Sequence, residues 1–532
     1  MTALARVIRK LDGAMNPVAV RELRQAVRSG VVTIGFVLFV LALLGAMGMY
    51  LLDQDAGGTE LEGGREIFTL LTGILVAASV GLLPIYTGTR LAAERGGVNA
   101  DLLFITTLSP GRIVRGKMLA AAMLTVMVFS ACAPFVTFTY LLRGIDFPTI
   151  FLVIAASFLL SVTASQLAIF LAALPVSVYV RVLIWLAFAG MMMALLPALF
   201  DGHSGVLSSI IIWGVNGWAG LWEAWPQLGT LLALDIVALG LFHVLTVALF
   251  MPPAANRTLR VRIYLTIAWL VSGVLAAAWA DELGFDEPMA LWGYGWWGFL
   301  ACCMIVAVSE RTSWGPRITR TIPANPLLRA GAFVLYTGAA GGVTWVVIMI
   351  LLTAAALGSG MGGMTTMTWG PGIREDVEIL MGLTFFAFAY SMTAALLRRY
   401  VLRRILPERH TGALAALLLC LGCFLPLLAA LVLYSGSRWR GGPHAIAGRA
   451  GWWNALNPFM LWEHDCRSLC TRTALVWAAV AALLSVPWYV EQVVLFRRSR
   501  PPEGPGETPE APAPAAVPDG LELVDDDERK AE

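Results

Sequence analysis

Twelve runs of apolar residues, each long enough to cross a lipid bilayer, follow one another along the chain. A transmembrane helix needs about 20 predominantly apolar residues. Of all residues, 58% are hydrophobic and 14% are charged, whereas soluble domains carry roughly a quarter charged residues. The sequence therefore predicts an all-α, polytopic integral membrane protein with about 12 transmembrane helices. The predicted spans are residues 31–52, 67–89, 118–141, 149–173, 182–200, 228–251, 263–280, 289–308, 332–357, 377–397, 411–434 and 473–495.

Arginine and lysine in the loops indicate the orientation, because both are enriched on the cytoplasmic side of a membrane. With the N-terminus inside, the inner segments hold 29 of the 37 basic residues and the outer loops hold 8. The sequence therefore predicts a multi-pass protein of the cytoplasmic (inner) membrane with both termini in the cytoplasm.

Residues 205–222, GVLSSIIIWGVNGWAGLW, are apolar enough to form a further span. If they crossed the membrane, every later loop would change side, and the count would become 18 basic residues inside against 19 outside. Because the asymmetry would then vanish, we expect a re-entrant or interfacial element on the outer side, a depth that suits its tryptophans.

The segment before the first span is predicted to contain an amphipathic helix. Asn16 is a suitable N-cap, and Pro17 fits the first helical turn. At about 100° per residue, Arg21, Arg24 and Arg28 fall within one narrow arc, opposite an apolar face. Such a helix lies in the membrane interface with its arginines toward anionic headgroups. An ordinary positive-inside anchor is the alternative interpretation.

The sequence Gly111-x-x-x-x-Gly116-Lys117 resembles a phosphate-binding loop but lacks its essential parts. That loop needs Ser or Thr after the lysine, a strand before the first glycine and a soluble helix after it. Here Met118 follows the lysine and a transmembrane span begins at that point. The chain is therefore expected not to hydrolyse ATP itself.

The inner loop 90–117 is better interpreted as a docking element. Acidic and basic residues alternate with leucines and isoleucine in its first part, which predicts a short amphipathic helix that Ser109 and Pro110 terminate. A helix with one apolar side needs a partner or the bilayer to cover that side, and both remain open. The residues proposed for docking are Glu94, Arg95, Asp101, Leu102, Leu103, Ser109, Pro110 and Lys117.

Two segments resemble the ABC-2 type transporter permease family: NPVAVRELRQAVRSG before the first span and AERGGVNADLLFITTLSPGRIVRGKMLAA between the second and third. The resemblance covers roughly residues 15–262, and its specific part is the second segment. The matching residues there are Glu94, Arg95, Asp101, Leu102, Leu103, Ser109, Pro110, Ile113, Val114, Gly116 and Lys117. The chain departs from the family at Gly97-Val98-Asn99, where Gly-Thr-Leu/Phe is more usual, and it lacks the proline that commonly precedes Leu108.

The resemblance implies a transmembrane permease subunit of an ATP-driven (ABC) exporter. The first segment would be the connecting helix, and the loop helix would be the coupling helix, which docks into a separate ATPase subunit. ATP and Mg²⁺ would be bound by that partner, and no cofactor or catalytic residue is expected in this chain. A dimer with itself or with a related permease is implied, within the lipid bilayer and without nucleic acid.

These inferences divide the chain into four parts. The spans after residue 262 exceed the six that are usual for the family, and they are treated as an extension. The predicted parts are a cytoplasmic connecting helix at 1–30, a six-helix permease domain at 31–262 with the coupling loop at 90–117, about six further helices at 263–498, and a disordered Pro-rich, acidic tail at 499–532.

Asp235 and His243 lie eight residues apart in the sixth span, so they share nearly the same helix face. Ionisable residues within a membrane are functional candidates by default, and a proton or substrate role is one interpretation. The alternative is structural, because Asp235 lies near one end of the span and can reach the interface.

The outer loop 435–472 supplies the second candidate function, a membrane-bound enzyme or scaffold. His464, Asp465, Cys466 and Cys470 cluster at its end. Such a cluster can bind a metal or become oxidised, but the outer loops otherwise supply only scattered carboxylates. No metal site is predicted, and the permease interpretation is preferred.

Overall fold

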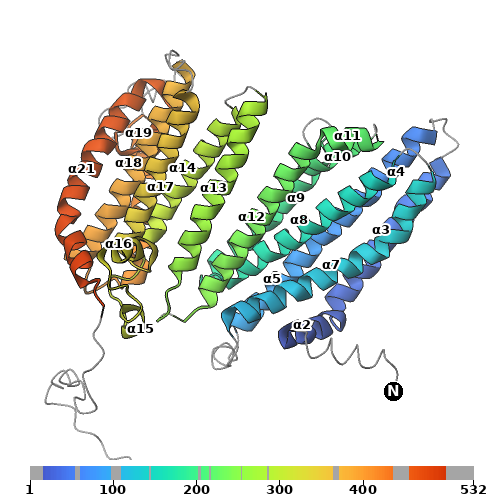
Figure 1. The fold of residues 1–532 in the computed structure, drawn as a ribbon, viewed down its shortest axis with the longest axis horizontal. Helices are drawn as coiled ribbons and strands as arrows, with labels where there is room; N and C mark the ends of the chain where they lie inside the picture. Colours follow the sequence, from blue (N-terminus) through green and yellow to red (C-terminus); the bar gives the residue numbers. More distant parts are fainter. Residues whose placement is uncertain are drawn as a thin grey trace, which may run out of the picture.

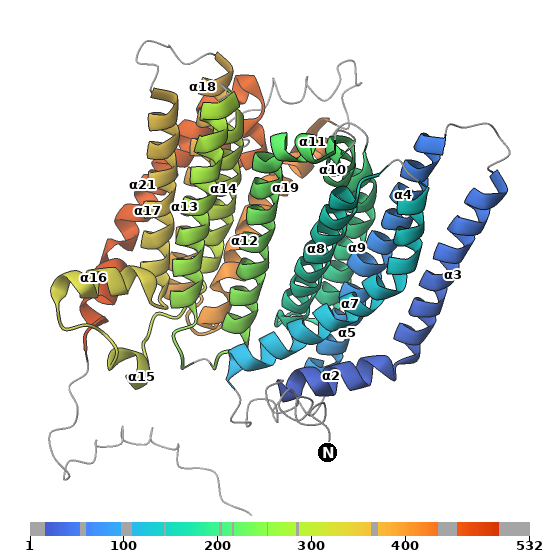
Figure 2. The same cartoon turned by 45° about the vertical axis from the view of Figure 1, so that its right-hand side comes forward.

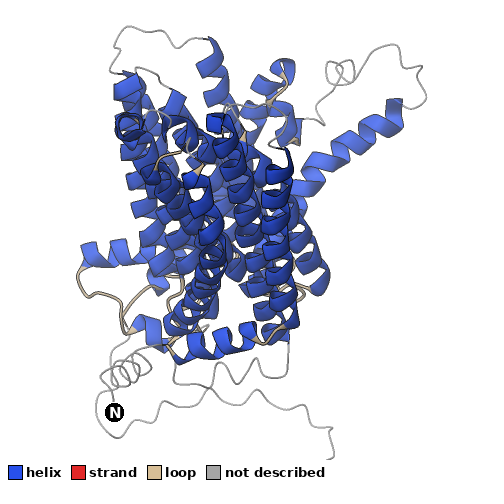
Figure 3. Cartoon of the chain, turned by 90° about the vertical axis from the view of Figure 1, so that its right-hand side faces the viewer, coloured by secondary structure: helices blue, strands red, loops and turns tan. Residues whose placement is uncertain are grey.

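The computed structural model describes residues 16–53, 60–96, 109–142, 145–201, 205–214, 217–252, 254–283, 287–362, 371–434 and 455–498. All regular elements within these ranges are helices (Figure 3). Eleven of the helical segments are long and apolar enough to cross a membrane. The prediction of an all-α, polytopic membrane protein is therefore confirmed. The centre of the inner loop (97–108), much of the outer loop (435–454) and the tail (499–532) lie outside the described residues.

The first group of helices runs from α2 to α12 (Figure 1). It comprises α2 (Pro17–Val27), α3 (Gly30–Asp53), α4 (Glu60–Val76), the π-helical segment η2 (Ala77–Leu82), α5 (Leu83–Gly96), α7 (Pro110–Leu141), α8 (Phe147–Ala173), α9 (Val178–Phe200), α10 (Val206–Gly214), α11 (Gly217–Glu223) and α12 (Trp225–Phe250). The segments α4, η2 and α5 form one continuous span. Phe68, Leu71 and Leu124 are fully buried at the centre of this group.

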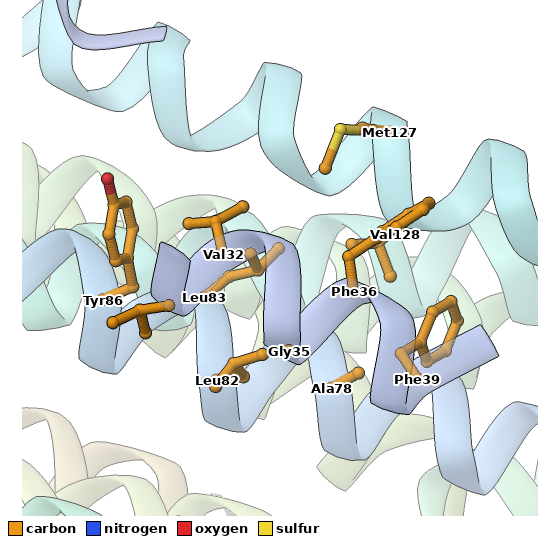
Figure 4. Close-up of a pocket in the computed structure, with 11 residues that line it drawn as sticks. Val32, Gly35, Phe36, Phe39, Ala78, Leu82, Leu83, Tyr86, Met127 and Val128 are labelled. Atoms are coloured by element: carbon orange, nitrogen blue, oxygen red, sulfur yellow. The ribbon is translucent and has the colours of Figure 1, made fainter. Parts of the chain in front are cut away.

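A glycine lets α3 pack closely against its neighbours. A Cβ atom at Gly35 would lie 2.5 Å from a methyl carbon of Leu82 in η2. Phe36 and Phe39 fill the rest of this contact, and the remaining gap measures about 10 Å³ (Figure 4). A gap of that size, with apolar walls, is a packing defect and not a ligand site.

The segment 205–222 does not cross the molecule. α10 has 9 residues and α11 has 7, and at about 1.5 Å per residue neither reaches the roughly 30 Å thickness of the hydrocarbon core. Both helices lie at the end of the molecule opposite α2 (Figure 2). This arrangement agrees with the re-entrant or interfacial element that the sequence predicts.

The second group of helices runs from α13 to α21. It comprises α13 (Thr258–Leu283), α14 (Glu287–Ala307), α15 (Pro316–Thr319), α16 (Pro326–Leu335), α17 (Ala339–Gly362), α18 (Pro371–Tyr400), η3 (Glu408–His410), α19 (Thr411–Tyr434), η5 (Pro458–Leu461) and α21 (His464–Leu495). The helix at the eleventh predicted span, α19, is apolar over Thr411–Pro426 of its described side chains. The two groups meet along α12 and α13 (Figure 1).

Two predicted boundaries in the second group are wrong. The span 332–357 is interrupted between α16 and α17, because Asn256 and Glu310 accept hydrogen bonds from the N–H groups of Thr337 and Gly338 and hold this stretch out of a helix. The last helix begins at His464, and its candidate span at Cys466 and not at residue 473. Arg467 in its first turn is buried and donates a hydrogen bond to the carbonyl oxygen of Leu461 in η5, so the low hydropathy of this residue does not end the helix.

Candidate functional site

Asn16 attaches α2 to the first turns of α7. Its Oδ1 atom accepts a hydrogen bond from the N–H of Val18 at 3.1 Å and so caps α2, as predicted. Its Nδ2 atom donates to the carbonyl oxygen of Arg112 at 2.6 Å. A Cβ atom at Gly116 would lie 2.8 Å from Cβ of Val18 and 2.9 Å from Nδ2 of Asn16. Because only glycine leaves room there, α2 lies directly on α7 (Figure 2).

Lys117 joins three helices through its ammonium group. Its Nζ atom lies 2.7 Å from a carboxylate oxygen of Glu22 in α2 and 2.7 Å from one of Glu94 in α5. The lysine side chain is only 7% exposed. Arg21 lies 3.3 Å from Glu22 and 3.7 Å from Glu94, so two positive groups balance two negative ones. We call Asn16, Glu22, Glu94, Gly116 and Lys117 the three-helix anchor.

The surroundings of the anchor are polar and contain a small cavity. Arg90 of α5 donates a hydrogen bond to the side-chain oxygen of Gln25 at 2.7 Å, which adds a second contact between α5 and α2. A cavity of about 30 Å³ lies between Glu22, Tyr86, Arg90 and Lys117. That volume is enough for an ordered water, with several polar groups to bond it.

The sequence prediction named only part of this anchor. It named Glu94 and Lys117 as docking residues, and the structure brings the two together across the ends of the inner loop. Ser109 is the N-terminal flanking residue of α7 and Pro110 is its first residue. Asp101, Leu102 and Leu103, and the side chain of Arg95, lie outside the described residues.

The sequence prediction missed Glu22 and the second role of Asn16. Glu22 is the single carboxylate in α2, whose other charged residues are arginines, and this isolation was the available signal. Arg21, Arg24 and Arg28 are exposed, whereas Ala19 and Ala26 are buried. The amphipathic pattern thus describes α2 correctly, but part of its inner face rests on protein.

The stretch from Gly111 to Lys117 is a continuous α-helix in the structure. The N–H groups of Arg112 and Ile113 already donate to the carbonyl oxygen of Ser109. A phosphate loop instead presents a row of unoccupied N–H groups to its ligand. The backbone of this stretch therefore has the wrong geometry for a nucleotide cradle.

A second group of polar residues lies between α8 and α12. Thr163 donates a hydrogen bond to the carboxylate of Asp235 at 3.0 Å, and the amide of Gln166 donates to Thr246 at 3.2 Å. Nδ1 of His243 and Oε1 of Gln166 are buried without a hydrogen-bond partner among the described residues. Asp235 thus lies on a polar contact between α8 and α12, and His243 lies on the same helix between Asp235 and Thr246.

The cluster at the end of the outer loop lies on the first turns of α21. Cys466 and Cys470 are buried there, packed with Phe386, Tyr390 and Leu461. The side chain of Asp465 lies outside the described residues. In the part of the chain that the structure describes, no three metal-ligating side chains gather. The two thiols therefore belong to an apolar packing cluster.

Searches with protein-family models, among curated proteins and among solved structures gave no match to this chain. The function therefore has to be inferred from the sequence and from the geometry of its sites. The three-helix anchor is the most highly connected of these sites, because it joins both ends of the inner loop to the helix that precedes the first span.

Proposed function

We propose that this chain is the transmembrane permease subunit of an ATP-driven (ABC) exporter and that it couples to a separate ATPase subunit through the inner loop 94–117. The subunit would lie in the cytoplasmic (inner) membrane with both termini inside. It would work as a dimer with itself or with a related permease, by alternating access. ATP and Mg²⁺ would be bound by the ATPase subunit.

The observation that carries this proposal is the link between the two ends of the loop. Glu94 lies in the last turn of α5 and Lys117 in the first turns of α7, and Glu22 of α2 completes the same ion cluster. A displacement of the loop would therefore be transmitted to α2, α5 and α7 together. Coupling between two sites is carried by salt-bridge networks and rigid helices that have two discrete arrangements, when both sites shift the equilibrium between those arrangements.

The helical conformation of Gly111 to Lys117 supports the division of labour between two chains. A permease that lacks a nucleotide cradle needs an ATPase partner to perform work. Asp235, which Thr163 hydrogen-bonds, and the buried Nδ1 atom of His243 lie inside the same group of helices, and they would bind substrate or protons during transport. The membrane-bound enzyme or scaffold remains the alternative from the sequence, with no further observation in its favour.

The test is co-purification of a soluble ATPase with the tagged protein in mild detergent. The variant Leu103→Asp removes apolar surface from the predicted docking helix, and Asp101→Lys inverts its charge. We expect the native protein to retain the ATPase and both variants to lose it.

The matched control is Leu327→Asp on α16. This leucine is 82% exposed, and its helix α16 lies toward the same end of the molecule as α2 (Figure 1). The control should retain the ATPase. A well-folded native protein that never captures an ATPase would refute the proposal, and equal capture by the loop variants would show that the contact lies elsewhere.

A further inference from the structure

The second group of helices encloses an apolar cavity of about 530 Å³. Its walls come from four helices: α14, α17, α18 and α21. On α17 the lining residues lie in the later part of the helix, from Val347 to Leu357, and on α18 they lie in the earlier part, from Val377 to Phe388. These two helices run in opposite directions (Figure 1), and the lining residues of α14 extend from Ala290 to Met304, along almost its whole length. The cavity therefore spans the middle of the second group of helices. Its size falls within the range of about 300–1,000 Å³ that is usual for ligand pockets.

The walls of this cavity offer almost nothing to a polar ligand. No charged side chain lines it. Thr384 is one of its few polar residues, and its hydroxyl group already accepts a hydrogen bond from the indole N–H of Trp297 and donates one to the carbonyl oxygen of Leu380. A buried water needs 2–4 polar partners. The cavity is therefore suited to hydrocarbon.

The cavity opens toward the surface that faces the bilayer. Leu351 is 63% exposed, Leu475 is 48% exposed and Met381 is 42% exposed, and all three line the cavity. These residues lie within segments that are long and apolar enough to span the membrane. At this depth the surroundings consist of acyl chains, so the entrance meets lipid hydrocarbon and not water.

We propose that this cavity binds one acyl chain of a bilayer phospholipid. Packing in a membrane is driven by close van der Waals contact, and an empty cavity would forfeit the contacts of every atom in its walls. An inserted chain restores them while its headgroup stays at the interface. The inference is independent of the exporter proposal, because the cavity lies in the helices beyond the permease-like region.

The experiment uses the full chain in vesicles that contain a phospholipid with a photoreactive diazirine on one acyl chain. After illumination, mass spectrometry identifies the labelled peptides. We expect labelling on the cavity faces of α17 and α21. Ala478 is 7% exposed and lines the cavity, so Ala478→Trp fills it and should abolish that labelling. Ala354→Phe fills it from α17 and should have the same effect.

The matched control is Val476→Trp on the same helix as Ala478. Val476 is 63% exposed and does not line the cavity, so this variant adds the same indole ring to the lipid-facing surface. It should keep the labelling of the cavity faces. Labelling that persists when the cavity is filled would overturn the proposal, because the probe would then report general lipid contact.

Two further measurements keep the test decisive. A free fatty acid with the same diazirine distinguishes the source of the chain, and labelling by the fatty acid alone would overturn the phospholipid assignment. Native mass spectrometry of the unsubstituted protein covers the case in which both filled variants fail to fold. A phospholipid that stays bound to the protein, and that an added phospholipid of different mass replaces, supports the proposal. A protein that carries no phospholipid contradicts it.

Discussion

Lys117 places one positive charge between two carboxylates, Glu22 and Glu94, at 2.7 Å from each. Replacement by methionine keeps the length of the side chain but leaves the two carboxylates close together and partly buried. Breaking a buried ion pair typically costs about 3–5 kcal/mol. We expect Lys117→Met to lower the thermal unfolding temperature in detergent markedly.

The comparison for this prediction is Arg115→Met, two residues earlier in α7. Arg115 is exposed, and its guanidinium donates to the carbonyl oxygen of Gly111 in its own helix. Its replacement should change stability little. Equal losses in the two variants would mean that the anchor does not hold the helices together.

Gly116 tests whether α2 is seated on α7. Gly116→Ala places a methyl group against Val18 and Asn16, so we expect α2 to move away. A cysteine at Ala26, which is only 2% exposed, should then react with a polar maleimide. Gly111→Ala is the control, because no atom lies within 4 Å of a Cβ at that position. A cysteine that stays protected in both variants would contradict the expected displacement.

The residues of the anchor could be predicted from the sequence only one at a time. Lys117 and Glu94 were found because they flank the inner loop. Their partner Glu22 was not, because the contact between Glu22 and Lys117 spans 95 residues and no local pattern encodes such a contact. The hydrogen bond from Asn16 to Arg112 spans 96 residues and was missed for the same reason.

At the scale of single elements, the short connection from α18 to α19 is held by Glu408. Its carboxylate accepts hydrogen bonds from the N–H and the hydroxyl of Thr312, at 3.2 and 2.6 Å, and lies 3.3 Å from Arg398. Burial alone would raise the pKa of Glu408, but the bonds from Thr312 and the charge of Arg398 outweigh it, so the pKa lies below its usual value. The connection is therefore fastened by a carboxylate in its charged form.

This pKa predicts an acid-sensitive contribution to stability. A carboxyl group whose pKa is lowered in the folded state stabilises the fold above its unfolded pKa, and the contribution is lost as the pH falls through the folded pKa. We expect the unfolding temperature to fall less steeply in Glu408→Gln than in the native protein as the pH falls below about 4.5. Parallel curves for the two proteins would exclude this role of Glu408.

Hydropathy predicted most helices, because the thickness of the bilayer fixes the length of an apolar segment. It failed where tertiary hydrogen bonds decide the backbone. At Thr337 and Gly338 the sequence is apolar enough to continue a span, but Asn256 and Glu310 bond the two N–H groups. Arg262 donates hydrogen bonds to the carbonyl oxygens of Val334 and Tyr336 and pairs with Glu310. Backbone carbonyl and N–H groups at the break therefore both have hydrogen-bond partners.

At the scale of the whole molecule, the two groups of helices meet closely at Gly240 of α12. A Cβ atom at this position would collide with the phenol oxygen of Tyr264 in α13, which donates a hydrogen bond to the carbonyl oxygen of Val237 at 2.8 Å. No pattern in the sequence predicted which of the helices from α13 to α21 pack against one another.

This contact predicts how the groups separate. With a protease site inserted after Ala255, between α12 and α13, the two fragments of the native protein should elute together in mild detergent. Gly240→Ala should separate them, and Gly240→Ala combined with Tyr264→Leu should restore the association. Gly229→Ala is the control on the same helix, since its Cβ would lie an ordinary 3.8 Å from Trp225. Co-elution of the fragments in Gly240→Ala would disprove the importance of this contact.

The long sequence separation within the anchor has a consequence for the biogenesis of the protein. Asn16 and Glu22 leave the ribosome well before Arg112 and Lys117, their partners 96 and 95 residues later. Two intervening spans, α3 and α4–η2–α5, enter the membrane in that interval. During synthesis α2 therefore lacks its contacts with α7 until that helix is made, and its exposed arginines can hold it at the membrane surface in the meantime. We expect α2 to pack on α7 only once α7 has been inserted, when Arg112 and Lys117 become available to Asn16 and Glu22.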